Sequence, residues 1–114
     1  MTERWIYIGE LGENGALDWG GDPNLGNIPK HLQPSIYGDD GFWIVVRLVD
    51  SGEFEGRKID WGAWALKLNG PQLREVLTRV FSVDIRRGNA AEEHIAFADK
   101  LGPDKYVALV AAEL

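Results

Sequence analysis

The stretch IDWGAWALKLNGPQLREVLTRVF, residues 59–81, decides the fold class because its hydrophobic pattern changes period halfway. Residues 59–68 alternate between the two faces of an expected strand, with apolar side chains on both faces. After Pro71, which suits the first turn of a helix, apolar side chains follow helical spacing at Leu73, Val76, Leu77, Val80 and Phe81. The sequence therefore predicts a strand over 59–68 that leads into an amphipathic helix over about 71–81.

Further strands are predicted on both sides of this unit. RWIYI, residues 4–8, is rich in aromatic and β-branched side chains, and YVALVAA, residues 106–112, is apolar throughout. FWIVVRLV, residues 42–49, is nearly continuous in apolar side chains, which predicts a central strand covered on both faces. SVDIRR, residues 82–87, is compatible with a short edge strand.

A second helix is expected near the C-terminal end. Asn89 and Glu92 have the spacing of a capping box, and Gly102-Pro103 end the helix after about Leu101. The order of elements predicts an α+β fold. We expect a single compact domain over 1–114, with a mixed or mostly antiparallel sheet of about four to five strands, two helices packed on one face, and a long Gly/Asp-rich N-terminal loop over 9–41.

Composition narrows the function classes. The chain has 114 residues, 45% of them hydrophobic, which is enough for one packed core and argues against disorder throughout. It contains no cysteine, so disulfides, thiolate metal sites and cysteine nucleophiles are excluded. No apolar run reaches the ~20 residues of a membrane span, and the N-terminal MTERWIYIGE does not resemble a signal peptide. We therefore expect a cytoplasmic protein that does not bind membranes.

The net charge of −6 is unevenly placed. Residues 1–60 hold eleven acidic and five basic side chains, whereas residues 61–114 hold seven of each. An acidic surface repels phosphate backbones, so nucleic-acid binding is not expected. The same field would steer a basic partner toward the protein.

The loop over 9–41 contains some residues that are typical of a calcium-binding loop. Asp22, Asn24 and Gly26 alternate, as oxygen ligands of calcium often do. The order of an EF-hand is not met, and no glutamate closes the loop. Asp, Asn, Gly and Pro are also the ordinary residues of turns. We expect no metal site and no cofactor.

No catalytic constellation is evident. His31 and His94 are far apart in sequence, and His94 is expected to face solvent or the edge of the second helix. The serines lack the context of a nucleophile. The pairs Asp39-Asp40 and Glu92-Glu93 are expected to be solvated, since paired carboxylates become catalytic only when their pKa values are driven apart. We therefore do not expect an enzyme.

Two residue types stand out against this background. Arg47 interrupts an apolar segment, and a guanidinium in a central strand would need a carboxylate partner, expected among the loop acids. Of the five tryptophans, Trp5, Trp43, Trp61 and Trp64 lie in predicted strands and are expected in the core. Trp19 instead lies in the acidic loop, where it is either a plug that holds the loop or an interface anchor.

The leading hypothesis is a protein–protein interaction protein, most concretely an inhibitor or immunity-type protein that occludes a basic bacterial toxin. The expected partner-binding residues are Asp18, Trp19, Asp22, Asp39 and Asp40, with the acids pairing to basic residues of the partner. Two alternatives stay open: a small-molecule or cation-binding module with the 9–41 loop as lid, and a homodimeric accessory domain. The sequence leaves monomer and homodimer undecided.

Overall fold

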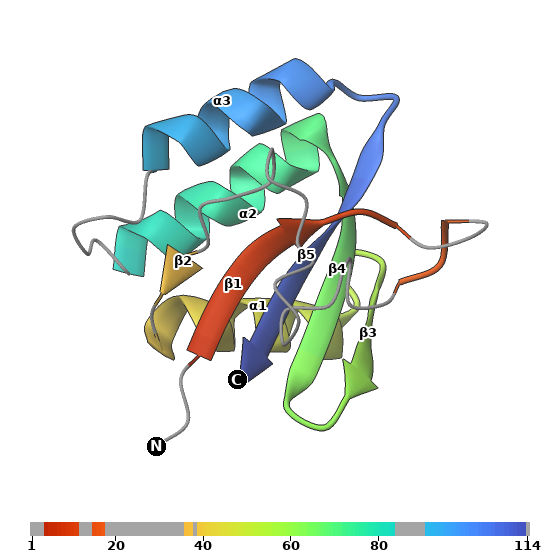
Figure 1. Cartoon of the computed structure of the whole chain (residues 1–114), viewed down its shortest axis with the longest axis vertical. Coiled ribbons are helices and arrows are strands. Elements are labelled where there is room, and N and C mark those ends of the chain that lie inside the picture. Colours follow the sequence, from red (N-terminus) through yellow and green to blue (C-terminus); the bar gives the residue numbers. More distant parts are fainter. Residues whose placement is uncertain (1–3, 12–14, 18–35, 38, 84–90, 114) are drawn as a thin grey trace.

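A computed structural model describes residues 4–11, 15–17, 36–37, 39–83 and 91–113. Within these ranges the chain forms five strands and three helices. In chain order they are β1 (Arg4–Gly9), β2 (Ile36–Tyr37), α1 (Asp39–Ser51), β3 (Gly56–Asp60), β4 (Ala63–Asn69), α2 (Gly70–Val83), α3 (Ala91–Leu101) and β5 (Tyr106–Glu113) (Figure 1). None of the helices in this described part combines the length and the apolar character needed to cross a bilayer.

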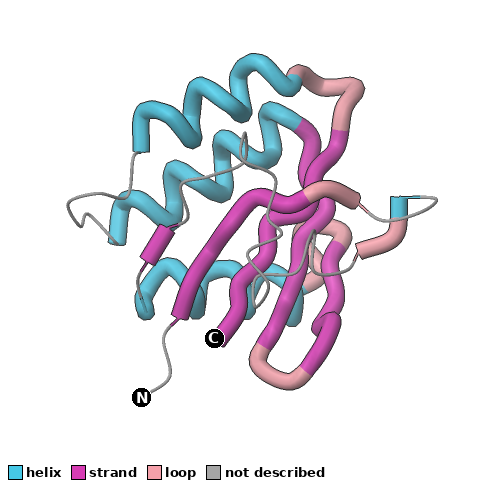
Figure 2. The backbone as a smooth tube through the Cα atoms, in the orientation of Figure 1, coloured by secondary structure: helices cyan, strands magenta, loops and turns pink. Residues whose placement is uncertain are grey.

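The strands form one antiparallel sheet in the order β2-β1-β5-β4-β3. Helices α1 and α2 cover one face of this sheet, and α3 packs on α2 (Figure 2). Because β5 pairs with β1 on one side and with β4 on the other, it joins the N-terminal strand to the β3–β4 hairpin. The predicted α+β class with an antiparallel sheet is confirmed.

The main core lies between the sheet and the helices. Its sheet side is made of every second residue of three strands, as the alternation of a strand requires, namely Ile6, Ile8, Leu66, Leu68, Val107, Leu109 and Ala111. Its helical side is made by Phe42, Val45, Val46, Leu48, Leu73, Val76, Leu77, Val80 and Ala98. The opposite face of the sheet carries a second buried cluster, which is dominated by alanine and includes Tyr7 and Leu17.

Helix α2 begins where its sequence indicates, at Asn69 and Gly70. The Asn69 side chain accepts a hydrogen bond from the Gln72 N–H at 3.0 Å, and the Gln72 side chain accepts one from the Asn69 N–H at 3.1 Å. This reciprocal pair is a capping box with asparagine as the cap. Helix α3 and strand β5 extend close to their predicted ranges.

The prediction of a central strand over 42–49 is wrong, because this segment forms most of helix α1. Its buried residues include Phe42, Val45 and Val46, spaced three and four apart, while Trp43 and Arg47 are exposed. A nearly unbroken apolar run fits a buried strand and a helix equally well, so the hydrophobic periodicity of residues 42–49 could not distinguish between the two. Arg47 is therefore not a buried cation, and within the described residues it has no ion pair with a loop acid.

Other boundaries also differ. The predicted strand 59–68 is a hairpin in which β3 and β4 are separated by Trp61 and Gly62. Helix α2 continues through Val83, so the edge strand at 82–87 is wrong where it can be compared, and residues 84–90 lie outside the described ranges. The three helices replace the two expected. The predicted loop 9–41 contains β2 and the start of α1, and its residues 12–14 and 18–35 lie outside the described ranges.

Gly70 lets the start of α2 touch the end of α3. Its N–H donates to the Gly102 carbonyl at 2.9 Å, and a Cβ at this position would lie 2.6 Å from the Ala98 carbonyl oxygen. Both neighbours are backbone atoms, so neither can move aside by rotating a side chain.

We expect Gly70→Ala to lower the free energy of unfolding by about 1–3 kcal/mol, because overpacking forces backbone shifts. Urea denaturation followed by circular dichroism measures this. Lys100→Ala, an exposed position in α3, is the matched control and should change stability by less than ~0.5 kcal/mol. Equal stability of Gly70→Ala and the wild type would contradict the close contact.

Candidate functional site

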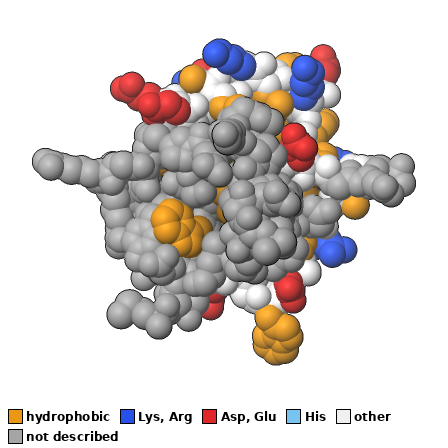
Figure 3. Space-filling view, in the orientation of Figure 1, with side chains coloured by type: hydrophobic (Ala, Val, Ile, Leu, Met, Phe, Trp, Pro, Cys, Tyr) orange, Lys and Arg blue, Asp and Glu red, His pale blue; other side chains and the backbone are white. Residues whose placement is uncertain are grey.

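The β3–β4 turn presents a tryptophan to solvent. The Trp61 side chain is 90% exposed. Its backbone is fixed on both sides, because the Asp60 carboxylate accepts the Trp61 N–H at 2.8 Å and the Glu113 N–H donates to the Gly62 carbonyl at 2.8 Å. Gly62 has φ +68°, the left-handed conformation that favours glycine. A hydrophobic side chain stands out from the lower end of the molecule, where the turn lies (Figure 3).

Trp61 is linked to the core through a second tryptophan. The Lys58 ammonium lies 5.1 Å from the ring centroids of both Trp61 and Trp64. Trp64 is half-buried and packs edge-on against Phe42 in α1, with ring centroids 5.6 Å apart. Since Phe42 is fully buried, Trp64 is held firmly. Among the described residues, the contacts of Trp61 are those of its backbone and of Lys58.

The same aromatic contacts continue to a third tryptophan. Trp43 packs edge-on against Phe42 at 5.2 Å and remains 40% exposed. The Arg4 guanidinium lies 5.5 Å from the Trp43 ring centroid and forms an ion pair with Glu113 at 3.5 Å. We call this surface the tryptophan end, defined as Trp43, Trp61 and Trp64 with the bases Arg4 and Lys58.

The structure places only part of the predicted binding set. Asp39 is the first residue of α1, and Asp40 is exposed in its first turn. Asp40 lies three residues before Trp43, so both occupy neighbouring positions on the helix surface at the tryptophan end. Asp18, Trp19 and Asp22 lie outside the described ranges, as does the possible cation ligand Asn24.

The sequence assigned Trp61 and Trp43 to the core, and both assignments are wrong. Trp61 was missed because IDWGAWALKL alternates like a strand throughout. The available signal was its flanking pair, Asp60 and Gly62, which are both turn formers. The exposure of Trp43 is not predicted because the apolar pattern of residues 42–49 indicates a buried strand.

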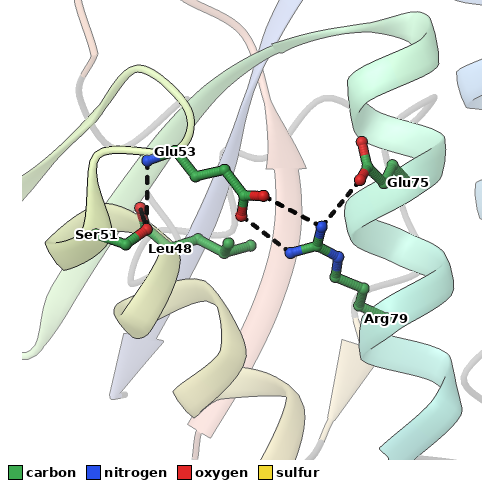
Figure 4. A network of polar contacts seen from close by, with 5 residues as sticks. All are labelled: Leu48, Ser51, Glu53, Glu75 and Arg79. Atoms are coloured by element: carbon green, nitrogen blue, oxygen red, sulfur yellow. Dashed lines mark hydrogen bonds and ion pairs between the residues drawn. The ribbon is translucent and has the colours of Figure 1, made fainter.

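A groove between α1 and α2 is the second candidate. It has a volume of about 490 Å³ and is lined by Ile44, Arg47, Leu48, Ser51, Glu53, Arg79 and Ser82. Figure 4 shows that Arg79 is already engaged: its guanidinium donates to Glu53 at 3.0 Å and to Glu75 at 2.9 Å. The hydrogen bond that Arg79 donates to Glu53 is the largest cause that raises the pKa of Arg79 above its ordinary value. The charges of Glu53 and Glu75 act in the same direction, and desolvation opposes them.

The two serines of the groove are engaged as well. The Ser51 hydroxyl donates to the Leu48 carbonyl and accepts the Glu53 N–H, and the Ser82 hydroxyl donates to the Arg79 carbonyl. The Ser51 contacts join the end of α1 to the following turn, and the Arg79–Glu53 contact joins that turn to α2 (Figure 4). The groove's polar lining is thus used mainly for structure.

The histidine expected to face solvent or the edge of its helix is buried instead. His94 is 3% exposed and lies against the Phe81 ring with centroids 5.8 Å apart. Because α3 packs on α2, His94 faces the helix interface. His31 lies outside the described ranges, and in the described part no three His, Asp or Glu residues gather in a group that could hold a metal ion.

No known protein family matches this chain, and neither a curated protein nor a solved structure has significant similarity to it.

Truncation of Trp61 and truncation of Trp64 are expected to change stability by very different amounts. Trp61→Ala should change the free energy of unfolding by less than ~0.5 kcal/mol because the side chain is exposed. Trp64→Ala should lower it by about 2–3 kcal/mol, somewhat less than truncation of a fully buried aromatic residue. Urea denaturation of both variants measures the difference. A large destabilisation by Trp61→Ala would mean that Trp61 has a structural role.

Proposed function

We propose that this chain acts by binding another protein through its tryptophan end. The observation that carries the proposal is the 90% exposure of Trp61 on a turn with a fixed backbone. Large rigid aromatic side chains are the commonest anchors of protein interfaces, since they bury much area at little conformational cost. The half-buried Trp64 shares the Lys58 ammonium with Trp61, and the partly exposed Trp43 is connected to Trp64 through Phe42.

The partner is proposed to be basic. The chain carries a net charge of −6, and the exposed Asp40 lies beside Trp43 on α1. The tryptophan end itself contains acids and bases, so charge supports the approach of the partner while the aromatic side chains support its retention. Asp18, Trp19, Asp22 and Asp39 stay predicted partner-binding residues on the basis of the sequence.

The most concrete form of this function is inhibition by occlusion. A small cytoplasmic protein of the immunity type would cover the active surface of a basic bacterial toxin, such as a nuclease. What supports this form is the acidic charge together with an exposed aromatic anchor, in a chain whose sequence shows no catalytic motif.

A small-molecule function has one observation in its favour, the groove between α1 and α2. Its volume of about 490 Å³ falls in the range of ligand sites. Its serines and Arg79 are engaged internally, which leaves Arg47 as the lining cation for a ligand. A thermal shift on ligand addition would favour this alternative.

Affinity capture with matched variants tests the proposal. The tagged chain is incubated with lysate of its source organism at low and high salt, and retained proteins are identified by mass spectrometry. We expect the wild type to retain a basic protein at low salt and to lose much of it at high salt, because salt screens the acidic field. Trp61→Ala should reduce retention at least tenfold, as loss of an interface anchor does.

Tyr106→Ala is the control, because Tyr106 is 46% exposed at the opposite end of β5. It should retain the partner as the wild type does. Reversing charge with Asp22→Lys and Asp40→Lys together should also abolish retention without loss of the fold. Equal retention by wild type and Trp61→Ala would contradict the proposal, and a doubled mass in solution that Trp61→Ala reduces to the monomer value would favour the homodimer.

A further inference from the structure

The Trp61–Trp64 pair already holds a cation supplied by the chain itself. The Lys58 ammonium lies 5.1 Å from both ring centroids, within the ~6 Å over which an indole attracts a positive charge. Lys58 and Trp64 are direct cross-strand partners in the β3–β4 ladder, and Trp61 lies in the turn just beyond them. The hairpin therefore brings two indoles to a single charge.

Only the two rings hold this ammonium among the described residues. Lys58 is exposed on β3, and no ion pair or hydrogen bond of its side chain is found in the described part of the chain. Its flexible stem has three further rotatable bonds beyond Cβ, so the ammonium can move into water without disturbing the strand. Lys58 is thus a replaceable occupant of the pair.

The space beside the pair suits a second cation. A shallow concavity of about 290 Å³ is lined by Lys58, Ile59, Asp60 and Trp61. The Asp60 carboxylate uses Oδ1 to accept the Trp61 N–H. An ionised carboxylate has further lone pairs for an incoming donor. A cation entering here would meet the Trp61 side chain and the Asp60 carboxylate together.

We propose that the Trp61–Trp64 pair is a subsite for an arginine or lysine side chain of a basic partner protein, and that this side chain displaces Lys58. The proposal rests on the proposed function and names the chemistry by which the tryptophan end recognises its partner. Arginine is preferred, because its planar guanidinium stacks on indole and is less strongly hydrated than an ammonium. Asp60 positions the incoming group by pairing with it.

Peptide titration of the isolated chain tests this subsite without the partner. The probe is a blocked tetra-arginine peptide, and its control is the same peptide with neutral citrulline. Binding is followed by the indole N–H signals in ¹⁵N-correlated NMR spectra, where Trp61→Ala and Trp64→Phe assign the two resonances. We expect both signals to shift with the arginine peptide and to stay fixed with the citrulline peptide.

Removing the internal occupant should strengthen peptide binding. We expect Lys58→Gln to bind the arginine peptide about two- to five-fold more tightly than Arg57→Gln does, the range of a single exposed cation–π contact. Arg57 is the matched control, since it is the exposed neighbour of Lys58 on β3 and its loss changes net charge equally. Asp60→Asn should weaken binding by a similar factor.

Two results would overturn the subsite. One is an arginine peptide that leaves the Trp61 and Trp64 signals unmoved, and the other is equal affinity of the Lys58→Gln and Arg57→Gln variants. The protein-binding proposal fails separately. A captured partner that needs Trp61 but is insensitive to Lys58→Gln overturns the subsite alone, whereas peptide binding at the pair with a Trp61-independent capture overturns the protein-binding function alone.

Discussion

The pairing of β5 with both β1 and β4 is the constraint on which the described structure depends. The register of these ladders places Arg4 opposite Glu113, and Ala63 opposite Ala112. The β3–β4 turn is thereby fixed beside the end of β5, where the Glu113 N–H reaches the Gly62 carbonyl. The residue pairs at the end of β5 therefore position both the Arg4 cation and the turn that carries the exposed Trp61. A slip by one residue would exchange the two faces and dismantle core and tryptophan end together.

Local chemistry explains which elements could be predicted from sequence. Helix α2 combines an apolar stripe with Pro71 at its start, so the hydrophobic periodicity and the helix-start signal indicate the same element. Strands β1 and β5 are short apolar segments bounded by turn residues, and their prediction is confirmed. Segment 42–49 offered neither a breaker nor a clear alternation. Its helical form follows from tertiary packing, since Phe42 and Val45 must face the sheet.

The candidate site was harder to predict from sequence than the fold, because strand pairing decides which tryptophan side chains are exposed to solvent. Nothing in the composition of IDWGAWALKL separates an exposed Trp61 from a half-buried Trp64. The difference arises when the strand folds back at Gly62 and directs one indole to solvent and the other to Phe42. Of the expected partner-binding residues, Asp40 is exposed in the first turn of α1 near Trp43, and its role in binding stays a prediction. Asp39 begins α1, whereas Asp18, Trp19 and Asp22 lie outside the described ranges.

Strand β3 forms one edge of the described sheet, and its composition bears on colloidal behaviour. An open edge with unpaired backbone groups is a template for pairing with a second chain and hence for aggregation. Here the exposed edge carries Arg57 and Lys58 in succession, and the ladder register shifts between Lys58 and Asp60. Adjacent like charges and an irregular ladder both oppose the alignment of another strand. The basic residues of β3 thus oppose self-association of an otherwise acidic protein at this edge of the described sheet, next to the turn that carries the exposed Trp61.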